Sequence, residues 1–183
     1  MDDYREFYKK IFSVDTDNNI KNLCELSKKT VLNKGQFIFA GNGGSMAISL
    51  HIAAELTGRF KKDRRSIPAY VLASNISSLT SVANDYDFSL VFQRELKPIL
   101  KKDDILILMS TSGESPNILK CIDLSTELNH QNTVLLTGGK DKEFNRNIKV
   151  IKTPSFNTAR IQEYHFFLLH EMCAYIDTLF SSS

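Results

Sequence analysis

Four side chains in two stretches of the chain have types and spacings that could bind a metal ion or move protons. His51 and Glu55 are four residues apart, so they share one face of a helix. Gln162 and His170 are eight residues apart and lie within about 80° of each other around a helix axis. Two imidazoles, a carboxylate and an amide oxygen can hold a divalent ion such as zinc, although glutamine is a less usual ligand. A helical histidine is more often a packed or surface residue, so the spacing alone leaves both alternatives open.

Two short runs of glycine and hydroxyl residues have the composition of anion-binding turns. In residues 41–45 (GNGGS), small side chains let backbone N–H groups approach an anion at the start of a helix. This run is not a P-loop, because the chain contains no GxxxxGK[ST] sequence. Residues 110–115 (STSGES) offer four hydroxyls around one point, and phosphate fits such a nest. Each run alone is also explained by a tight turn and an ordinary helix cap.

The elements that must position these residues are those of an α/β protein. Apolar runs rich in β-branched or aromatic residues predict strands at 36–40, 69–73, 105–109, 133–137 and 148–152. The first four are almost continuously apolar, as expected for strands covered on both faces, and helix-like segments separate several of them. The two glycine and hydroxyl runs follow the first and third strands. They therefore lie where open parallel sheets bind ligands, at the carboxyl ends of the strands.

The remaining segments predict helices. After the first strand, helices are predicted over 45–56, over 77–83, over 88–100 with a bend or end at Pro98, from Ser115 as N-cap onwards, and over about 158–180.

Two further helices are predicted before the first strand, separated by a break at the polar cluster 15–19. They either cover one face of their own sheet or join a bundle with other subunits, and we favour the bundle. The domain division predicted is therefore residues 1–34 for oligomerisation and residues 35–183 for the α/β domain.

Length and composition exclude several classes of protein. With 183 residues, 42% hydrophobic and 24% charged, the chain is long enough for one globular domain and is not a disordered polymer. The formal net charge is +2, and the basic run at 61–65, broken by an acid, is expected to be a solvated loop or a helix end, so no nucleic-acid partner is predicted. Three cysteines without CxxC spacing favour a reducing cytoplasm. No apolar leader or membrane-length apolar run occurs, so no membrane partner is expected.

Five runs occur together in one order and spacing: AGNGGS followed by His51 and Glu55, then AELTGRF, ANDY, STSGESPN and TARIQEYHFFLLH. Over residues 36–176 the chain thereby resembles the phosphoheptose isomerases, members of the sugar isomerase (SIS) domain superfamily. The resemblance implies that residues 35–183 form a SIS domain, a three-layer αβα sandwich with a five-stranded parallel sheet, preceded by N-terminal helices.

The resemblance also implies an activity and an assembly. Family members convert sedoheptulose 7-phosphate to D-glycero-D-manno-heptose 7-phosphate for lipopolysaccharide or capsule, and many are zinc-binding homotetramers. For this chain we expect a cytoplasmic homo-oligomer, a tetramer with shared active sites, holding one zinc per subunit. The conversion passes through an enediol and needs a base and an acid, which we assign to Glu55 and His170.

Matching to the family motifs also implies the ligands and the substrate contacts. The implied zinc ligands are His51, Glu55, Gln162 and His170. The implied substrate contacts are Asn42, Gly43, Gly44, Ser45, Glu55, Asn84, Asp85, Ser110, Thr111, Ser112, Ser115 and Gln162, with Ser45 and also Arg59 as weaker candidates.

Other functions of the same fold stay open at this point. A noncatalytic SIS adaptor would bind a protein partner, but such relatives lose the acid and base, whereas Glu55 and His170 are present here. A phosphosugar-sensing regulator or an isomerase of another phosphosugar is a further alternative. The chain departs from many members at Met46, Ile48 and Leu50, where a polar helix face becomes apolar.

Overall fold

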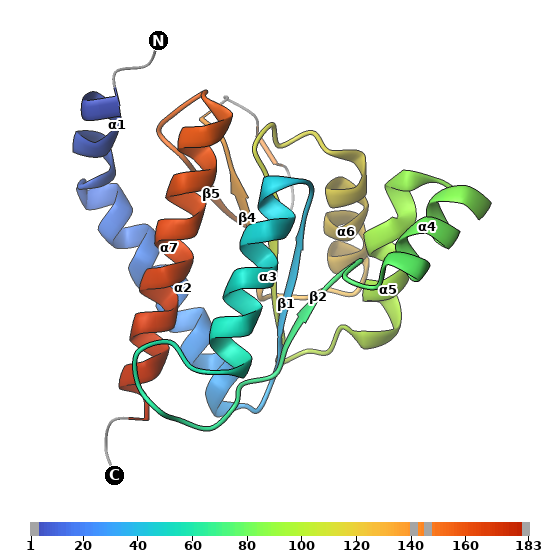
Figure 1. Ribbon diagram of the computed structural model, residues 1–183, viewed down its shortest axis with the longest axis horizontal. Coiled ribbons are helices and arrows are strands. Elements are labelled where there is room, and N and C mark those ends of the chain that lie inside the picture. Colours follow the sequence, from blue (N-terminus) through green and yellow to red (C-terminus); the bar gives the residue numbers. More distant parts are fainter. Residues whose placement is uncertain (1–3, 140–142, 145–147, 181–183) are drawn as a thin grey trace.

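The computed structural model describes residues 4–139, 143–144 and 148–180, and its centre is a parallel five-stranded sheet between two layers of helices (Figure 1). The strand order is β2-β1-β3-β4-β5. The strands are β1 (Phe37–Gly41), β2 (Ala69–Val71), β3 (Ile105–Ser110), β4 (Thr133–Thr137) and β5 (Lys149–Lys152). This confirms the predicted αβα fold and all five predicted strands.

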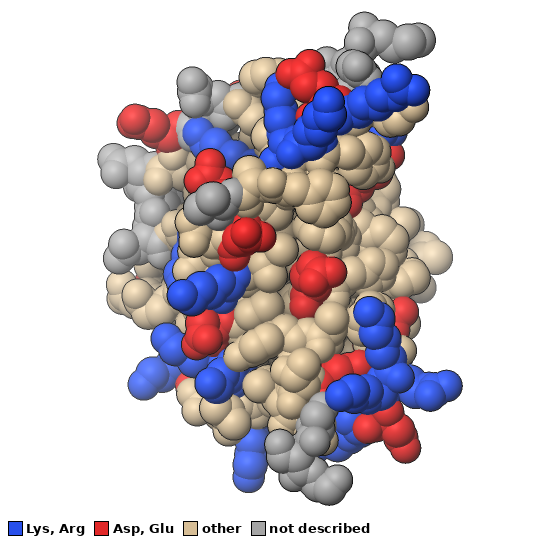
Figure 2. Space-filling model, turned by 90° about the vertical axis from the view of Figure 1, so that its left-hand side faces the viewer, with Lys and Arg blue, Asp and Glu red and all other residues tan. Residues whose placement is uncertain are grey.

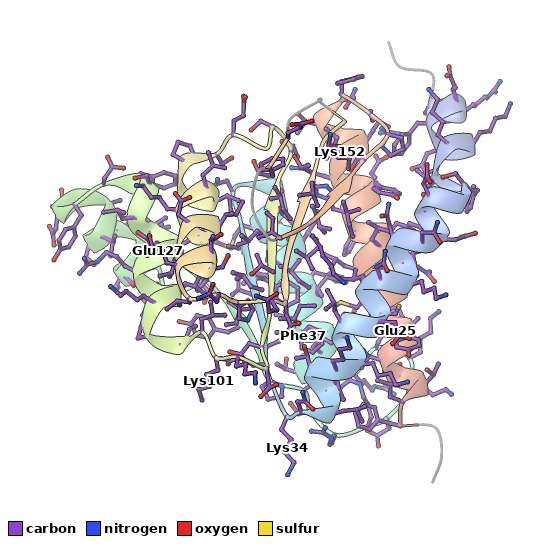
Figure 3. The ribbon with its side chains drawn as sticks, turned by 180° about the vertical axis from the view of Figure 1, so that it is seen from behind. Glu25, Lys34, Phe37, Lys101, Glu127 and Lys152 are labelled. Carbon is purple, nitrogen blue, oxygen red and sulfur yellow. The ribbon has the colours of Figure 1, made fainter. Side chains whose placement is uncertain are left out.

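The apolar runs form strands because both faces of the sheet are covered. Every residue of β1, β3 and β4 is buried. Along β1 the side chains alternate between the two layers, so Phe37 and Phe39 enter one core while Ile38 and Ala40 enter the other. Figure 3 shows Phe37 between the sheet and the N-terminal helices. At the sheet edge, β5 instead keeps Lys149 and Lys152 exposed.

The helices divide between the two faces of the sheet. One face carries α1 (Tyr4–Ile11), α2 (Val14–Leu32), α3 (Gly44–Thr57) and α7 (Thr158–Thr178). The other carries α4 (Ile76–Asp85), the 3-10 turn Phe88–Leu90, α5 (Val91–Ile99) and α6 (Pro116–Glu127). Each predicted helix beyond the first strand is present, with ends shifted by a few residues. No helix within the described ranges has the length and apolar character needed to span a membrane.

The N-terminal helices differ from their prediction in one respect. The predicted break at 15–19 is wrong, because α2 begins at Val14 and these polar residues form its first turns. The Ser13 hydroxyl accepts a hydrogen bond from the Thr16 N–H at 3.4 Å, and Asp15 and Asp17 lie at the positive end of the helix dipole. The polar residues 15–19, whose types are common in turns, therefore also favour the start of a helix.

These two helices cover a face of their own sheet, which is the alternative that the sequence analysis does not favour. Phe7, Ile11, Leu23 and Leu26 belong to the same core as Phe37. That the helices also join other subunits stays a prediction.

The chain order creates a crevice between β1 and β3. From β1 the chain crosses to β2 on one side and later returns to β3 on the other side. Ligands bind at the carboxyl ends of strands on either side of such a reversal. The two glycine and hydroxyl runs follow these two strands, so the topology brings them together.

Candidate active site

The loop after β3 gathers three serine hydroxyls. Ser110 Oγ lies 2.9 Å from Ser115 Oγ and 3.5 Å from Ser112 Oγ. Ser115 directly precedes α6, as predicted, yet within the described chain its side chain makes no capping hydrogen bond to that helix. Its hydroxyl instead faces the cluster. Gly113 has a φ of +70°, which favours glycine, and its N–H donates to Ser110 Oγ at 3.1 Å.

The loop after β1 lies beside this cluster and is tied to it. The Asn42 and Asn117 side chains exchange two hydrogen bonds of 2.9 Å, which join the loop to the first turn of α6. Gly43 has a φ of +54° at the start of α3. The two helix starts and the serine hydroxyls together provide donors for one anion.

Gln162 approaches the same loop from α7. A Cβ at Gly44 would lie 2.6 Å from Gln162 Nε2, so only glycine lets the amide lie this close. His51 is seven residues further along α3, which corresponds to about 10 Å of helix rise. The structure therefore places Gln162 with the phosphate-type loops and not beside His51.

The other predicted group meets on the outer side of α3 and α7. These helices run side by side in the same direction (Figure 1). His51 Nε2 lies 3.3 Å from Glu55 Oε1 and 3.5 Å from His170 Nε2. The side chain of His51 is 48% exposed and that of Glu55 is 24% exposed. The base and acid predicted from the sequence therefore flank one imidazole that solvent can reach.

Two phenylalanines surround the histidines and were not singled out from the sequence. The Phe166 ring centre lies 4.8 Å from that of His51 and 4.1 Å from that of His170. Phe60 stacks on His170 at 5.5 Å with an interplanar angle of 24°. Burial among these groups, with His51 adding to the effect, lowers the pKa of His170. Its imidazole is therefore neutral near neutral pH.

The residues meet the requirements of a metal site in part. Ligands of a tetrahedral zinc ion, bound at about 2.0–2.1 Å, lie about 3.3–3.4 Å apart. The His51–Glu55 and His51–His170 distances match this spacing. Among residues 4–139, 143–144 and 148–180, however, no three His, Cys, Asp or Glu side chains are arranged to hold an ion together. The pairs His51–Glu55 and His51–His170 each have the spacing of two zinc ligands. The three side chains do not, however, point toward one common position for an ion.

The remaining predicted residues lie in three settings. Ser45 is buried and Thr111 half-buried beside the two loops. Asn84 and Asp85 are exposed at the end of α4, where Asn84 Nδ2 donates to Asp85 Oδ1 at 2.8 Å. Arg59 is exposed after α3. Within the described chain, the hydrogen bonds of Asn84 and Asp85 join them to neither loop.

Comparison with known proteins agrees with this arrangement. The model of the SIS domain family matches residues 2–138, beginning ahead of the boundary predicted at residue 35. A phosphoheptose isomerase from a Nitratiruptor species is 44% identical over 150 residues, which cover 81% of this chain and 79% of the relative.

Solved structures show the same likeness. A phosphoheptose isomerase from Francisella tularensis superposes with a TM-score of 0.81 at 32% identity, over 88% of this chain and 86% of that one. One from Neisseria gonorrhoeae gives a TM-score of 0.79 at 31% identity, over 96% and 91% of the two chains. The chain belongs to the SIS domain family and, within it, to the phosphoheptose isomerases, enzymes that isomerise phosphosugars.

Proposed function

We propose that the chain converts sedoheptulose 7-phosphate to D-glycero-D-manno-heptose 7-phosphate through an enediol, in the formation of heptose for lipopolysaccharide or capsule. The observation that carries the proposal is the meeting of Glu55, His51 and His170 across α3 and α7. An aldose-ketose conversion requires a base and an acid close to one another, and a protein-binding adaptor requires neither.

Glu55 and His170 supply the proton transfers in this proposal. Glu55 removes a proton from carbon one of the ketose, while the oxygen on carbon two receives a proton from His170. The enediol then gives the proton of the oxygen on carbon one to His170 and receives at carbon two the proton that Glu55 holds, which gives the aldose and restores both residues. The neutral state of His170 suits this exchange, because a neutral imidazole both donates and accepts a proton.

The loops after β1 and β3 bind the phosphate. Ser110, Ser112 and Ser115 direct three hydroxyls toward one point. Holding the phosphate there fixes the sugar chain in register with the acid and base, which lowers the entropic part of the barrier.

We also propose that a divalent metal, zinc, binds at His51, Glu55 and His170. The spacing of the two ligand pairs supports this, and binding requires the side chains to turn toward a common point. Gln162, which the family resemblance implies as a fourth ligand, lies with the loop at Gly44 and is not placed to join these three side chains. When bound, the ion would polarise the substrate oxygens. Coordination weakens a carboxylate as a base, so Glu55 acts best as a base when it is off the ion. We expect one ion per subunit. The variant His170→Gln is expected to lose its bound zinc, measured by elemental analysis, and its turnover, measured by NMR.

A homo-oligomer, and within it a tetramer with shared active sites, is the assembly that we propose. His51 is half-exposed, and Asn84 and Asp85 lie apart from both loops, so neighbouring subunits are needed to close the site. Figure 2 shows the side of the molecule with α1, where Lys and Arg are interspersed with Asp and Glu around a broad uncharged band. Such a surface suits a protein partner better than nucleic acid.

We place the protein in the cytoplasm, and its cysteines support that choice. Cys24, Cys121 and Cys173 are free and buried, as expected in a reducing compartment.

The experiment that tests the function incubates the purified protein with sedoheptulose 7-phosphate, with and without a chelator, and follows aldose formation by NMR. We expect aldose that disappears when the chelator is added. Aldose that persists with the chelator would support the isomerase and contradict the zinc proposal. A folded, zinc-loaded oligomer that makes no aldose would contradict the proposed substrate and favour a different phosphosugar.

A further inference from the structure

The loop between α3 and β2 contains a fully buried guanidinium. The side chain of Arg64 is 0% exposed. Its Nη2 donates to the carbonyl of Glu55 at 2.7 Å, and its Nη1 donates to the carbonyl of Leu56 at 2.8 Å. These carbonyls belong to the last turn of α3, where helix carbonyls lack partners within the helix and the dipole is negative. Arg64 therefore caps the end of the helix that carries His51 and Glu55.

The partner of this guanidinium is on α7. Asp177 Oδ1 accepts from Arg64 Nε at 3.0 Å, and the Asp177 side chain is 3% exposed. Asp177 follows His170 by seven residues, so the two side chains lie on nearly the same face of α7, two turns apart. The ion pair thus connects the helix of the proposed base to the helix of the proposed acid.

Asp177 also fixes the loop that leads to Arg64. Its Oδ2 accepts from the backbone N–H groups of Lys61 and Lys62 at 2.8 and 2.9 Å. Phe60, the residue before Lys61, stacks on the ring of His170. One carboxylate therefore determines both the position of Arg64 and the place of the ring that packs on His170.

We propose that Arg64 and Asp177 are positioning residues, which set α3 against α7 and so hold Glu55 and His170 in the geometry that turnover needs. The inference rests on the roles proposed above for Glu55 and His170.

The arrangement of these bonds favours positioning over stability alone. A buried ion pair is often no more stabilising than apolar side chains of the same volume. Here the planar fork of Arg64 contacts the backbone of Glu55 itself, and a lysine cannot reproduce several fixed donors at once. A displacement of about 1 Å in a reacting group can lower a rate by about 100-fold. A small shift of the Arg64–Asp177 pair would therefore also move the proposed reacting groups, Glu55 and His170.

The test compares Arg64→Lys with Arg65→Lys in the full-length chain. Arg65 is the matched control, because it is exposed, donates to the Val31 carbonyl at 3.4 Å and lies over the Phe180 ring. With sedoheptulose 7-phosphate, Arg64→Lys is expected to lower kcat about tenfold or more while KM changes less than about threefold. KM should change little, because the serine cluster that binds the phosphate lies near the start of α3, away from Arg64, and is expected to keep its geometry. Arg65→Lys is expected to leave both constants within about twofold of wild type.

A second variant and a measurement without substrate complete the test. Asp177→Glu keeps the charge but moves the carboxylate by one methylene, and it should reproduce the selective loss of kcat. In NMR spectra of the free protein, the ring protons of His170, which lie in the ring current of Phe60, should shift in Arg64→Lys and not in Arg65→Lys.

The outcomes separate this inference from the proposed function. Wild-type kcat in folded Arg64→Lys, a parallel change of kcat and KM, or unmoved His170 resonances would each overturn the positioning role. If the wild-type chain does not convert sedoheptulose 7-phosphate, the proposed function fails, and the His170 resonances still decide whether the pair positions that ring.

Discussion

At the scale of single residues, His51 is the point where the two catalytic candidates meet. Its Nε2 faces Glu55 from the same helix and His170 from a residue 119 positions away. Because this one nitrogen faces both groups, it bonds to them in alternative ways: while it donates to Glu55, it cannot accept a hydrogen bond from His170. The three side chains should therefore respond together when one of them is changed.

Glu55→Gln tests the base. The substitution keeps the size of the side chain and removes its ability to accept a proton, so turnover should fall by about 100-fold or more. The measurement is aldose formation by NMR, with circular dichroism to show that the fold is intact. Glu25→Gln, at an exposed carboxylate on α2, is the control and should turn over like wild type. An active Glu55→Gln enzyme would remove Glu55 from the role of base.

Ser112→Ala tests the phosphate-binding loop. Removing one hydroxyl from the cluster weakens binding of the phosphate in ground state and transition state alike, so KM should rise by roughly tenfold and kcat should change less. Steady-state kinetics measure this split. Ser27→Ala, a buried serine on α2 whose hydroxyl donates to the Leu23 carbonyl, is a control outside the site. A large fall in kcat with unchanged KM would contradict the binding role.

Some of these residues could be identified from the sequence and others could not. The pair His51 and Glu55 follows from helical spacing, which one stretch of sequence contains. Arg64 could not be identified, because its run of charges predicts a solvated loop and its partner Asp177 lies 113 residues away. The loop prediction is correct for exposed Lys61 and Arg65 and wrong for the buried side chain of Arg64. Phe60 acquires its role through the same distant contact.

At the scale of elements, the helices of one layer are joined by polar contacts inside an apolar core. Thr16 Oγ1 lies 2.9 Å from the hydroxyl of Tyr164, which links the first turn of α2 to α7. Tyr164 is almost completely buried and Thr16 nearly so. Leaving one of these hydroxyls without its partner should cost free energy, because water cannot replace the bond there.

Tyr164→Phe tests this link. The substitution removes the hydroxyl that Thr16 and Asn19 both contact and leaves Thr16 Oγ1 with its longer 3.4 Å hydrogen bond from Ser13 Oγ, so the free energy of unfolding should fall by about 1–3 kcal/mol in urea denaturation. Tyr8→Phe makes the same change at a half-exposed hydroxyl that is 3.2 Å from Glu163, and it should have little effect. Equal effects of the two substitutions would contradict the importance of burial.

The Asp177 carboxylate predicts how stability depends on pH. Burial alone would raise its pKa, but hydrogen bonds from Lys61 and Lys62 and the charge of Arg64 outweigh burial and lower the pKa below its ordinary 3.8. A carboxyl with a lowered folded pKa contributes stability that is present above about pH 4 and is lost as the pH falls through the folded value.

Asp177→Asn should therefore be destabilising by about 3–5 kcal/mol near neutral pH, since it leaves a buried guanidinium unpaired. The difference in Tm from wild type should stay constant from about pH 8 to 5 and shrink below about pH 4. Thermal unfolding followed across that range measures it. A difference that shrinks near neutral pH would contradict the assignment to this carboxyl.

The elements themselves were largely predictable. Strands such as β3 (ILILMS) can be predicted from the sequence, because a short run that is apolar at every position indicates a strand covered on both faces. Helix starts are less certain, since Asp, Thr and Asn favour both turns and first helical turns. Because of this competition, the residues around Val14 do not by themselves indicate the start of α2. The start of α6 after Ser115 is indicated clearly, because Pro116 is favoured at the first position of a helix.

At the scale of the whole molecule, the site is open. His51 is half-exposed on the outside of α3, and Asn84 and Asp85 lie on the opposite layer from α7. Figure 3 shows the two ends of the sheet, with Lys34 and Lys101 at one end and Lys152 at the other. An enediol is sensitive to water, so an open site of this kind needs cover.

Sedimentation velocity at micromolar concentration should therefore give an oligomer. The expected result is one species larger than a monomer, because in the proposed assembly neighbouring subunits cover the site. Its control is the same run with the active-site variant Glu55→Gln, which should sediment like wild type. A monomer that still isomerises its substrate would contradict shared active sites.

The position of α7 after α2, α3 and β1 in the chain has a consequence for biosynthesis. Its residues Leu168 and Met172 complete the core that α2, α3 and β1 begin, and His170 completes the acid-base group. While the chain emerges from the ribosome, the earlier helices expose apolar surface until α7 has been made. A nascent chain at that stage exposes a surface to which chaperones bind, and it lacks the proposed acid His170. Synthesis of α7 is thus the step that closes the apolar core of this layer.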